Sequence, residues 1–520
     1  MSIFKMKKVF GYGLATASAL GLGKSLIDNN FDVGSLAVVR LGRAGLTVFD
    51  VMKMYKSDFY YEVKRLKLEE TSEEYSALRS QVHKKSAERI LELCRANKGV
   101  YIKVGQHIGA LEYLVPIEYV DTMKVLHSNA PRSSLEDVLR VLREELKCDP
   151  SDVFSRIEPE PQGTASLAQV HKAWLKDGST VAVKVQHPFV RKNSAVDLTT
   201  MEVMAKFLMW VFPDFDFQWL VNESKKNIPL ELDFEKEAGN MEKVREVFKH
   251  FSWLKIPEIY PALSTSRVLT MEFTEGGQVN DLEYMQKNNI DVVKVSDNLG
   301  RLYSQMIFNT GFVHSDPHPG NILVHKSDDG STQIVLLDHG LYATLSNDVR
   351  WAYSKLWLGI INCDENAMKD SCESLGVARE LYPVFSCMVS GRTWEAILSG
   401  LSRTKYTLKE KELFQIGIPS FLSQVLNALA NVNCQLLLIL KTNDLLRGIE
   451  HTLKTQARNV SFLVMSRSCI RSVYGERLSA TSGRFSRFCL KLEESWILLK
   501  LTLYYTYLSI CDVFSKNPVL

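Results

Sequence analysis

Val313-His-Ser-Asp-Pro-His-Pro-Gly-Asn321 and Val335-Leu-Leu-Asp-His-Gly340 are the two most informative segments of this 520-residue chain. They place a carboxylate at Asp316, an amide five positions later at Asn321, and a second carboxylate, Asp338, at the end of a predicted strand. Phosphotransferases use this order of groups: the first Asp faces the acceptor, while the Asn and the second Asp hold Mg²⁺ against the phosphates. An Asp-x-Gly alone is also an ordinary turn, so the prediction depends on both motifs. Together they predict Asp316 as a catalytic base or orienting group and the other two residues as metal ligands.

A glycine- and alanine-rich segment upstream supplies the matching phosphate-binding pattern. Gly163-Thr-Ala-Ser-Leu-Ala-Gln-Val170 fits the kinase loop G-x-G-x-x-G-x-V, with alanines replacing the second and third glycines. Strands are predicted at Gln169–Leu175 and Thr180–Gln186 around a Lys-Asp-Gly turn, and the second strand carries Lys184. We expect Lys184 to contact the α- and β-phosphates of ATP and Glu237 to orient it. The predicted phosphate-binding residues are Gly163, Thr164, Ala165, Ser166, Ala168, Val170 and Lys184.

A predicted strand at Val268–Phe273, ended by the Gly276-Gly277 turn, matches the linker between two kinase lobes. Backbone groups of Glu272 and Phe273 would hold the adenine edge of ATP there. The apolar pattern of residues 195–212 predicts a helical insertion in the first lobe. After the second carboxylate motif the chain is mainly helical, and no Ala-Pro-Glu ends an activation segment. We therefore predict the α+β class: a two-lobed, protein-kinase-like fold with a helical N-terminal extension and a mainly helical C-terminal lobe.

Three features together resemble one family of atypical kinases: the alanines of the phosphate loop, the stretch Lys103-Val-Gly-Gln106, and the Asp-Pro-His-Pro-Gly-Asn motif. They resemble the aarF-domain (UbiB-type) family, most closely its mitochondrial members, over most of the chain. The resemblance implies that the helix with Lys103 and Gln106 folds over the acceptor side of the active site in a regulatory role. It also implies that Glu231 and Asp233 form the partner motif of that helix, that Glu237 pairs with the phosphate-binding lysine, and that ATP and Mg²⁺ are the cofactors.

The resemblance also implies a role in mitochondrial membrane, lipid or ubiquinone homeostasis, with a lipid or isoprenoid small molecule as a partner. Three classes of function follow from the residues and the resemblance: an atypical kinase or ATPase, a nucleotide-binding pseudokinase that regulates a mitochondrial protein partner, and a conventional protein kinase. The absence of an activation segment and the helix carrying Lys103 disfavour the third class. The first class is favoured because every phosphate- and metal-handling residue is present, although a fold does not by itself establish a function.

Two histidines depart from the ordinary kinase pattern. His339 stands where kinases usually have Phe after the metal-binding Asp, and it would either pack or form hydrogen bonds and titrate. His318 lies between two prolines, and no second His has a metal-ligand spacing to it. We predict that His318 shapes the loop.

Composition excludes some classes of partner. A net charge of +3 and a pI near 8.2 give no global indication of nucleic-acid binding. The nine cysteines contain no C-x-x-C pair, which predicts reduced thiols rather than a disulfide framework or a zinc site.

The two ends of the chain carry separate signals. Residues 1–27 contain four lysines and no acid around an apolar run, which is typical of a mitochondrial presequence, a secretory signal or a membrane anchor. The family resemblance favours the mitochondrial reading, with the protein associated with the inner membrane on an unspecified side. Between His451 and Cys489 seven basic residues face one acid, and the apolar and aromatic stretch Trp496–Phe514 follows. This tail would either contact a membrane surface or pack as a docked helix.

The predicted domains follow from these boundaries. They are a targeting or membrane segment (1–27), a helical extension with the Lys-x-Gly-Gln motif (28–150), a kinase-like first lobe with a helical insertion (151–275), a kinase-like second lobe (276–455), and a basic and apolar tail (456–520).

Overall fold

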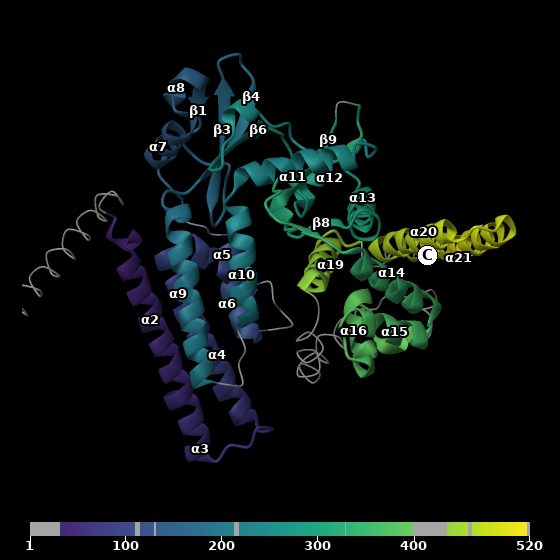
Figure 1. The fold of residues 1–520 in the computed structure, drawn as a ribbon, viewed down its shortest axis with the longest axis horizontal. Helices are drawn as coiled ribbons and strands as arrows, with labels where there is room; N and C mark the ends of the chain where they lie inside the picture. The colour runs from purple at the N-terminus through teal and green to yellow at the C-terminus, as the bar shows by residue number, and fades with distance from the viewer. Residues whose placement is uncertain are drawn as a thin grey trace, which may run out of the picture. The chain divides into compact units, whose positions relative to one another are not determined.

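The computed structural model describes residues 32–109, 115–128, 132–212, 218–327, 329–398, 434–455 and 460–516. The chain divides into two compact units (Figure 1). The first comprises the residues up to Glu235 together with Ile259–Phe273, and the second comprises Lys236–Glu258 and the chain from Thr274 onward. The predicted targeting segment, residues 1–27, lies outside the described residues. Among the described helices, none combines the length and the apolar character needed to cross a bilayer.

Helices make up the N-terminal part of the first unit. The α4 helix begins after Ser72, whose Oγ accepts a hydrogen bond from the Tyr75 N–H at 3.2 Å, and two glutamates stand in its first turn. The long helices α2, α4, α9 and α10 lie side by side (Figure 1). The helices are α2 (Ala37–Lys53), α3 (Glu62–Leu66), α4 (Glu73–Asn97), α5 (Val100–Gly109), α6 (Ile117–Ser128), α7 (Leu135–Leu146), α8 (Pro150–Val153), α9 (Val190–Val211) and α10 (Gln218–Glu231), with a π-helical turn at Met54–Tyr61. The predicted helical insertion is α9.

An antiparallel sheet forms the rest of the first unit, with strand order β1-β3-β4-β6 and the short β2 paired to β3. Its strands are β1 (Phe154–Ile157), β2 (Gly163–Thr164), β3 (Ala168–Leu175), β4 (Thr180–Gln186) and β6 (Val268–Glu272). The predicted hairpin is therefore confirmed as β3 and β4. The apolar face of α7 packs on this sheet through Val138, Val141 and Leu142, which are buried with strand residues such as Val183. Burial of these aliphatic side chains stabilises the unit.

The second unit contains two small sheets surrounded by helices. One has the order β5-β10-β9-β7 and the other pairs β11 with β8. The strands are β5 (Leu254–Lys255), β7 (Gly277–Gln278), β8 (Phe312–His314), β9 (Ile322–Lys326), β10 (Thr332–Leu336) and β11 (Tyr342–Thr344). The helices are α11 (Phe234–Val247), α12 (Leu282–Lys287), α13 (Val292–Ser304), α14 (Asn347–Asn362), α15 (Glu365–Ser374), α16 (Tyr382–Ser390), α17 (Trp394–Leu398), α19 (Cys434–Thr452), α20 (Val460–Ala480) and α21 (Arg484–Lys516), with a π-helical turn at Gln305–Thr310.

The connection after the second carboxylate motif is short. Strand β11 begins two residues after Gly340 and helix α14 begins at Asn347, so no long activation segment separates them. This agrees with the absence of an Ala-Pro-Glu sequence.

The two helices of the C-terminal tail differ in their surroundings. Helix α20 packs against α13 and α14, its Cys469 is fully buried, and the Cys469 thiol contacts the Ser354 carbonyl at 3.0 Å. The docked-helix alternative concerns Trp496–Phe514, within α21, whereas the helix packed on α13 and α14 is α20, in the basic part of the tail. Helix α21 packs on α20 but leaves a row of large apolar side chains exposed. All seven cysteines whose side chains the structure describes are free thiols, as the spacing predicts.

Candidate functional site

The phosphate loop of the first unit is a tight hairpin. Gly163 and Thr164 in β2 pair with Val170 and Gln169 in β3, and the Ala165 N–H donates to the Ala168 carbonyl at 2.8 Å. The predicted loop residues therefore lie together, and the bend falls on the residues between the two alanines.

The tip of this loop is anchored by a side chain. Leu167 is buried against Val100 of α5, Val190 of α9, and Ile228 and Leu232 at the end of α10. A leucine buried among four aliphatic side chains would have to be exposed before the loop could move far, so this contact restrains it.

His187 provides a second anchor. Its Nε2 lies 3.1 Å from the Ala165 carbonyl, and its Nδ1 lies 2.8 Å from Ser133 Oγ. A carbonyl only accepts hydrogen bonds, so Nε2 carries the proton, and Nδ1 accepts from the serine hydroxyl. Burial lowers the pKa of His187 and favours this neutral form. The His187 N–H also donates to the Leu167 carbonyl at 3.0 Å.

Strand register places Lys184 next to the phosphate loop. In β4 it lies opposite Val170 of β3 on one side and Leu269 of β6 on the other. The side chain is mostly buried, with Nζ 5.1 Å from the centroid of the Phe234 ring.

The predicted adenine-binding residues lie at the end of β6. Glu272 is opposite Val181 of β4, and the Phe273 N–H donates to the Thr180 carbonyl at 3.3 Å. This bond occupies the Phe273 N–H, so an adenine contact from Phe273 would have to use its carbonyl.

The Lys-x-Gly-Gln motif lies on α5, and its lysine reaches the predicted partner motif. Lys103 Nζ is 2.6 Å from Glu231 Oε2, and the two side chains are only 13% and 9% exposed. Gly105 lies against α6, where an added Cβ would clash with Leu126. Gln106 Nε2 donates to the Leu126 carbonyl at 2.9 Å. Lys103 thus ties α5 to α10, while Gly105 and Gln106 fix α5 on α6. Asp233, the other predicted regulatory residue, follows the end of α10, and its N–H donates to the Leu230 carbonyl at 3.2 Å.

In the second unit, a β-hairpin brings the two predicted metal ligands to the same edge. Ile322, the first residue of β9, pairs with Leu336, the last residue of β10. Asn321 precedes the first strand and Asp338 follows the second, and the Leu337 N–H donates to the Asn321 carbonyl at 3.0 Å. Antiparallel pairing therefore places these residues side by side.

Asp316 is joined to the same edge by its own loop. The Asp316 carbonyl accepts hydrogen bonds from the His318 N–H at 2.8 Å and from Asn321 Nδ2 at 3.2 Å. The His318 ring accepts from the Gly320 N–H at 3.1 Å, which confirms the predicted loop-shaping role.

Lys441 is a residue of this site that the sequence did not reveal. It lies on α19, and its Nζ is 3.3 Å from Asp316 Oδ1. The only signal in the sequence is a cation that follows the apolar run Leu436–Leu440. A lysine in this position holds the carboxylate and adds positive charge where phosphate chemistry would occur.

Two buried histidines fix the turn around Asp338. His314 Nε2 donates to the Asp338 carbonyl at 2.7 Å, and its Nδ1 accepts from the Tyr303 hydroxyl at 2.8 Å. Burial lowers the pKa of His314, so the neutral form is favoured. His339 is likewise buried, with Nε2 3.2 Å from the Leu336 carbonyl and Nδ1 2.9 Å from the Tyr342 hydroxyl. The predicted alternatives of packing and hydrogen bonding therefore both apply to His339.

Helix α11 holds the backbone of His339. Buried Glu237 accepts a hydrogen bond from the His339 N–H at 3.2 Å through Oε1. Asn240 Nδ2 donates to the His339 carbonyl at 2.9 Å. Glu237, which is predicted to orient Lys184, is thus fixed by the residue that follows Asp338.

The donors at the hairpin edge fit Mg²⁺. The hydrogen bond from Asn321 Nδ2 to the Asp316 carbonyl orients the Asn321 amide, so that its Oδ1 is the atom available to a cation. Asp338 Oδ1 accepts from the Gly340 N–H at 2.9 Å, which orients the carboxylate. Mg²⁺ is commonly held by one or two such protein oxygens together with substrate phosphates and water. The predicted site residues fall into two sets, one in each unit, and each set is internally well ordered.

Comparison with known proteins identifies the family of this chain. The profile of the ABC1 atypical kinase-like domain matches residues 125–372. AarF domain-containing kinase 1 of Drosophila melanogaster is 51% identical over 509 residues, covering 98% of this chain and 98% of the relative. AarF domain-containing protein kinase 1 of Gallus gallus is 48% identical over 497 residues, covering 95% and 94%. Among solved structures, an erythromycin complex from Mycobacterium tuberculosis aligns with a TM-score of 0.48 and 22% identity, covering 73% of this chain and 94% of that chain. The fold is kinase-like, and the chain belongs to the ABC1/AarF family of atypical kinases.

Proposed function

We propose that this protein is an Mg-ATP-dependent atypical kinase or ATPase whose acceptor is a lipid, an isoprenoid or water rather than a generic protein. The observation that carries the proposal is the grouping of Asp316, Asn321 and Asp338 at one edge of the β9–β10 hairpin. Three oxygen-bearing side chains at one edge provide a base or orienting group and two metal ligands.

Each remaining residue has a role in the proposal. Lys184 and the backbone of the phosphate loop would bind phosphates, and Glu237 would position Lys184. Asn321 and Asp338 would hold Mg²⁺, which neutralises phosphate charge when bound. Asp316 would orient the attacking hydroxyl or water and accept its proton, with Lys441 holding the carboxylate.

Two features argue against a generic protein substrate. The chain passes from Gly340 to α14 without an activation segment on which a peptide could dock. Lys103 and Glu231 form a mostly buried ion pair that secures α5, the helix which the family resemblance associates with the acceptor side. A small acceptor suits such a restricted site better than a polypeptide does.

The proposal is tested by nucleotide binding and turnover of the full chain. Asp338→Asn should abolish the Mg²⁺-dependent rise in Tm that ATP or ADP produces, because a metal ligand is lost. Asp348→Asn, a change of the same kind at an exposed position in the first turn of α14, is the control and should keep the rise. An unchanged rise in Asp338→Asn would refute the site assignment. Nucleotide binding with no turnover under any condition would favour the alternative of a pseudokinase that regulates a partner protein.

We also propose that the protein acts at the mitochondrial inner membrane, with α21 in contact with the lipid surface. Helix α21 presents exposed Phe485, Phe488, Leu492, Trp496, Leu499 and Leu503. Their spacing of three or four residues places them on one face of the helix. Arg484, Arg487 and Lys491 lie along the same stretch. An apolar stripe flanked by basic residues suits an anionic membrane surface.

Vesicle sedimentation tests this contact. Replacing Trp496 and Leu499 by Gln should reduce binding to anionic vesicles, and replacing the three flanking basic residues by Gln should make the remaining binding insensitive to salt. Leu398→Gln, at another exposed apolar position, is the control and should leave binding unchanged. Equal binding of all variants would exclude α21 as the contact.

A further inference from the structure

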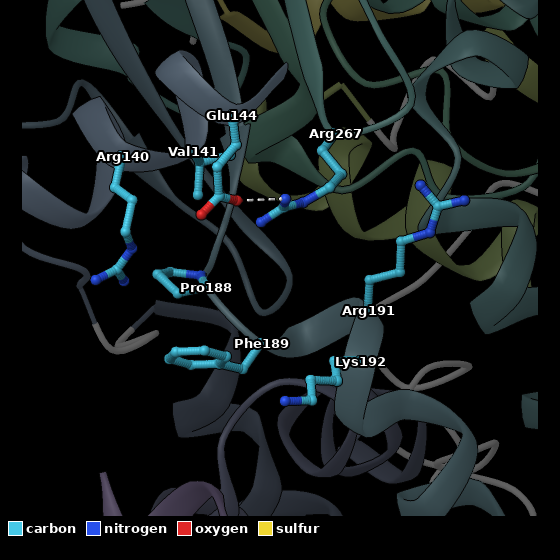
Figure 2. A pocket seen from close by; sticks show the side chains of 8 residues that line it. All are labelled: Arg140, Val141, Glu144, Pro188, Phe189, Arg191, Lys192 and Arg267. Carbon is cyan, nitrogen blue, oxygen red and sulfur yellow. Dashed lines mark hydrogen bonds and ion pairs between the residues drawn. The ribbon is translucent and has the colours of Figure 1, made fainter. Parts of the chain in front are cut away.

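A cavity of about 410 Å³ lies on the first unit, and Figure 2 shows the side chains that line it. It is formed where α7, the start of α9 and the residue before β6 meet. Its lining residues are Arg140, Val141, Glu144, Pro188, Phe189, Arg191, Lys192 and Arg267. No residue predicted for nucleotide or metal binding is among them.

The charge of this lining is strongly unbalanced. Four of the eight residues are cations, and Glu144 is the single carboxylate among them. Glu144 pairs with Arg267 at 2.9 Å, as Figure 2 shows. Arg267 also contacts Glu145 at 3.3 Å, and Arg140 pairs with Asp137 at 2.6 Å. These acidic partners act on Arg140 and Arg267.

Arg191 and Lys192 are in a position that ordinarily disfavours basic residues. Arg191 and Lys192 stand in the first turn of α9, a 22-residue helix with no acidic residue in that turn. The helix dipole is positive at this end, so basic residues there repel it and anions are attracted. Arg191 Nη1 donates to the neutral Ser266 hydroxyl at 2.6 Å. A bound anion would offset the repulsion between the dipole and these two side chains.

The cavity also has an apolar wall. Figure 2 shows Phe189 and Pro188 facing the cavity below Glu144. Phe189 has a left-handed backbone, with φ of 64° at the N-cap of α9, and the Arg140 guanidinium lies 5.8 Å from its ring centroid. A bulky residue in this conformation is uncommon and costs energy, so it is held there by the surrounding structure. The wall would contact the carbon part of a ligand.

We propose that this cavity binds a phosphate-bearing anion, a phosphomonoester with a small organic group. Arginine guanidinium groups match phosphate oxygens in paired hydrogen bonds, and three of the four cations are arginines. A phosphomonoester carries about 1.5 to 2 negative charges at pH 7. The lining offers four cations to such a ligand, and with Glu144 and the adjacent Asp137 and Glu145 counted the local excess is one positive charge. The phosphate could come from a soluble metabolite or from a lipid headgroup, because both present the same chemistry.

The cavity is connected to the phosphate loop through His187, which forms hydrogen bonds to the Ala165 and Leu167 carbonyls. Pro188 and Phe189 follow His187, whose ring holds the Ala165 carbonyl. A ligand that rests on these two residues would therefore sit beside the anchor of that loop.

Isothermal titration of the full chain with glycerol 3-phosphate and with inorganic phosphate tests the proposal. The titrations are done in EDTA without nucleotide, so that no metal–phosphate complex forms. Replacing Arg191 and Lys192 together by Gln should weaken binding by about tenfold or more, because charge-assisted hydrogen bonds are lost. Glu144→Gln should strengthen binding, because it removes the carboxylate that repels the ligand. Lys206→Gln, an exposed change on the same helix outside the cavity, should have no effect.

Two further arms separate the sources and the sites. Vesicles containing phosphatidic acid test the lipid source. If the chain binds these vesicles but not glycerol 3-phosphate, and the Arg191 and Lys192 variant loses the vesicle binding, the phosphate belongs to a lipid. Lys184→Met tests the phosphate loop as an alternative site: phosphate binding should persist in this variant and should still be weakened when the Arg191 and Lys192 changes are added. Absence of binding to all three probes at millimolar concentration would overturn the proposal. Binding that is abolished by Lys184→Met, or that is unchanged in the Arg191 and Lys192 variant, would also overturn it.

Discussion

The phosphate loop and the segment from Asp316 to Asp338 are both held firmly, but by different means. The loop depends on distant parts of the chain, because Leu167 is buried among residues of three helices and His187 holds the Ala165 carbonyl. The Asp316–Asp338 segment is held by its own hairpin and by the neighbouring His314 and His339, with further contacts from α11 and from Lys441 of α19. The pairing that brings Asn321 beside Asp338 could therefore form locally, whereas the phosphate loop requires the helical extension to be packed. Glycines make an ordinary phosphate loop flexible. The alanines that replace two of them here remove part of that conformational freedom.

The largest effect confined to the Asp316–Asp338 segment is expected from Asp316→Asn. If Asp316 orients the acceptor and takes its proton, turnover should fall by about 10³-fold, within the usual range for a positioned base. The Mg²⁺-dependent rise in Tm with ATP should persist, because the metal ligands are intact. Turnover and Tm are measured together, with Asp348→Asn as the control. Loss of turnover by less than tenfold would remove Asp316 from the catalytic role.

The packing that restrains the phosphate loop should be weakened most by Lys103→Met. Lys103 and Glu231 tie α5 to α10, two of the three helices that bury Leu167, and the change removes the cation that pairs with buried Glu231. The expected loss is about 3 kcal/mol of unfolding free energy, with increased self-phosphorylation as the loop loosens. Adding Glu231→Leu should restore much of the stability, since both charges are then gone. A double variant less stable than Lys103→Met would show that the ion pair is not the cause.

Lys441→Met tests the contact between Lys441 and Asp316. Removing the cation 3.3 Å from Asp316 should lower turnover by about tenfold and leave nucleotide affinity unchanged. Combined with Asp316→Asn it should add little, because the two groups act together. Lys355→Met, an exposed lysine on α14, serves as the control. Additive losses in the double variant would indicate that Lys441 acts independently of Asp316.

The smallest effect concerns His187 and pH. Burial places the pKa of His187 below the ordinary value near 6.5. Between the two values the unfolded chain binds more protons than the folded chain, so stability falls as the pH decreases from about 6.5. His187→Gln should reduce this acid-dependent loss, measured as the difference in unfolding free energy between pH 7.5 and 5.5. The loss should not vanish, because the pKa values of His83 and His314 are also lowered. If His187→Gln leaves the pH dependence of the unfolding free energy unchanged, the assignment is contradicted.

Sequence patterns predicted the parts of this site that depend on near neighbours. Strand alternation and a turn placed Lys184 on a strand, as β4 shows. The Asp-Pro-His-Pro-Gly-Asn and Asp-His-Gly motifs predicted that Asn321 and Asp338 act together as metal ligands, and the register of β9 and β10 brings the two residues to one edge. Patterns did not reveal Lys441, because its contact with Asp316 joins residues 125 positions apart. They also did not reveal the burial of Leu167, because the sequence of an alanine-rich loop does not distinguish a buried leucine from an exposed one.

The tail illustrates the same limit. The apolar residues of α20 and α21 are similar in kind, yet Cys469 and Val473 are buried while Leu492 and Trp496 are exposed. Which face is covered is decided by tertiary packing on α13 and α14, and no local pattern carries that information.

The position of Lys441 has a practical consequence for choosing fragments to express. The matched kinase-like domain ends at residue 372, so a fragment cut at that boundary would lack the lysine that contacts Asp316. It would also lack α20, whose Ser472 hydroxyl donates to the Phe308 carbonyl at 2.9 Å and whose removal would expose apolar surface of α13 and α14. Such a fragment is expected to aggregate and to misreport the turnover of the whole chain. A piece suitable for biochemistry should therefore extend at least through Ala480.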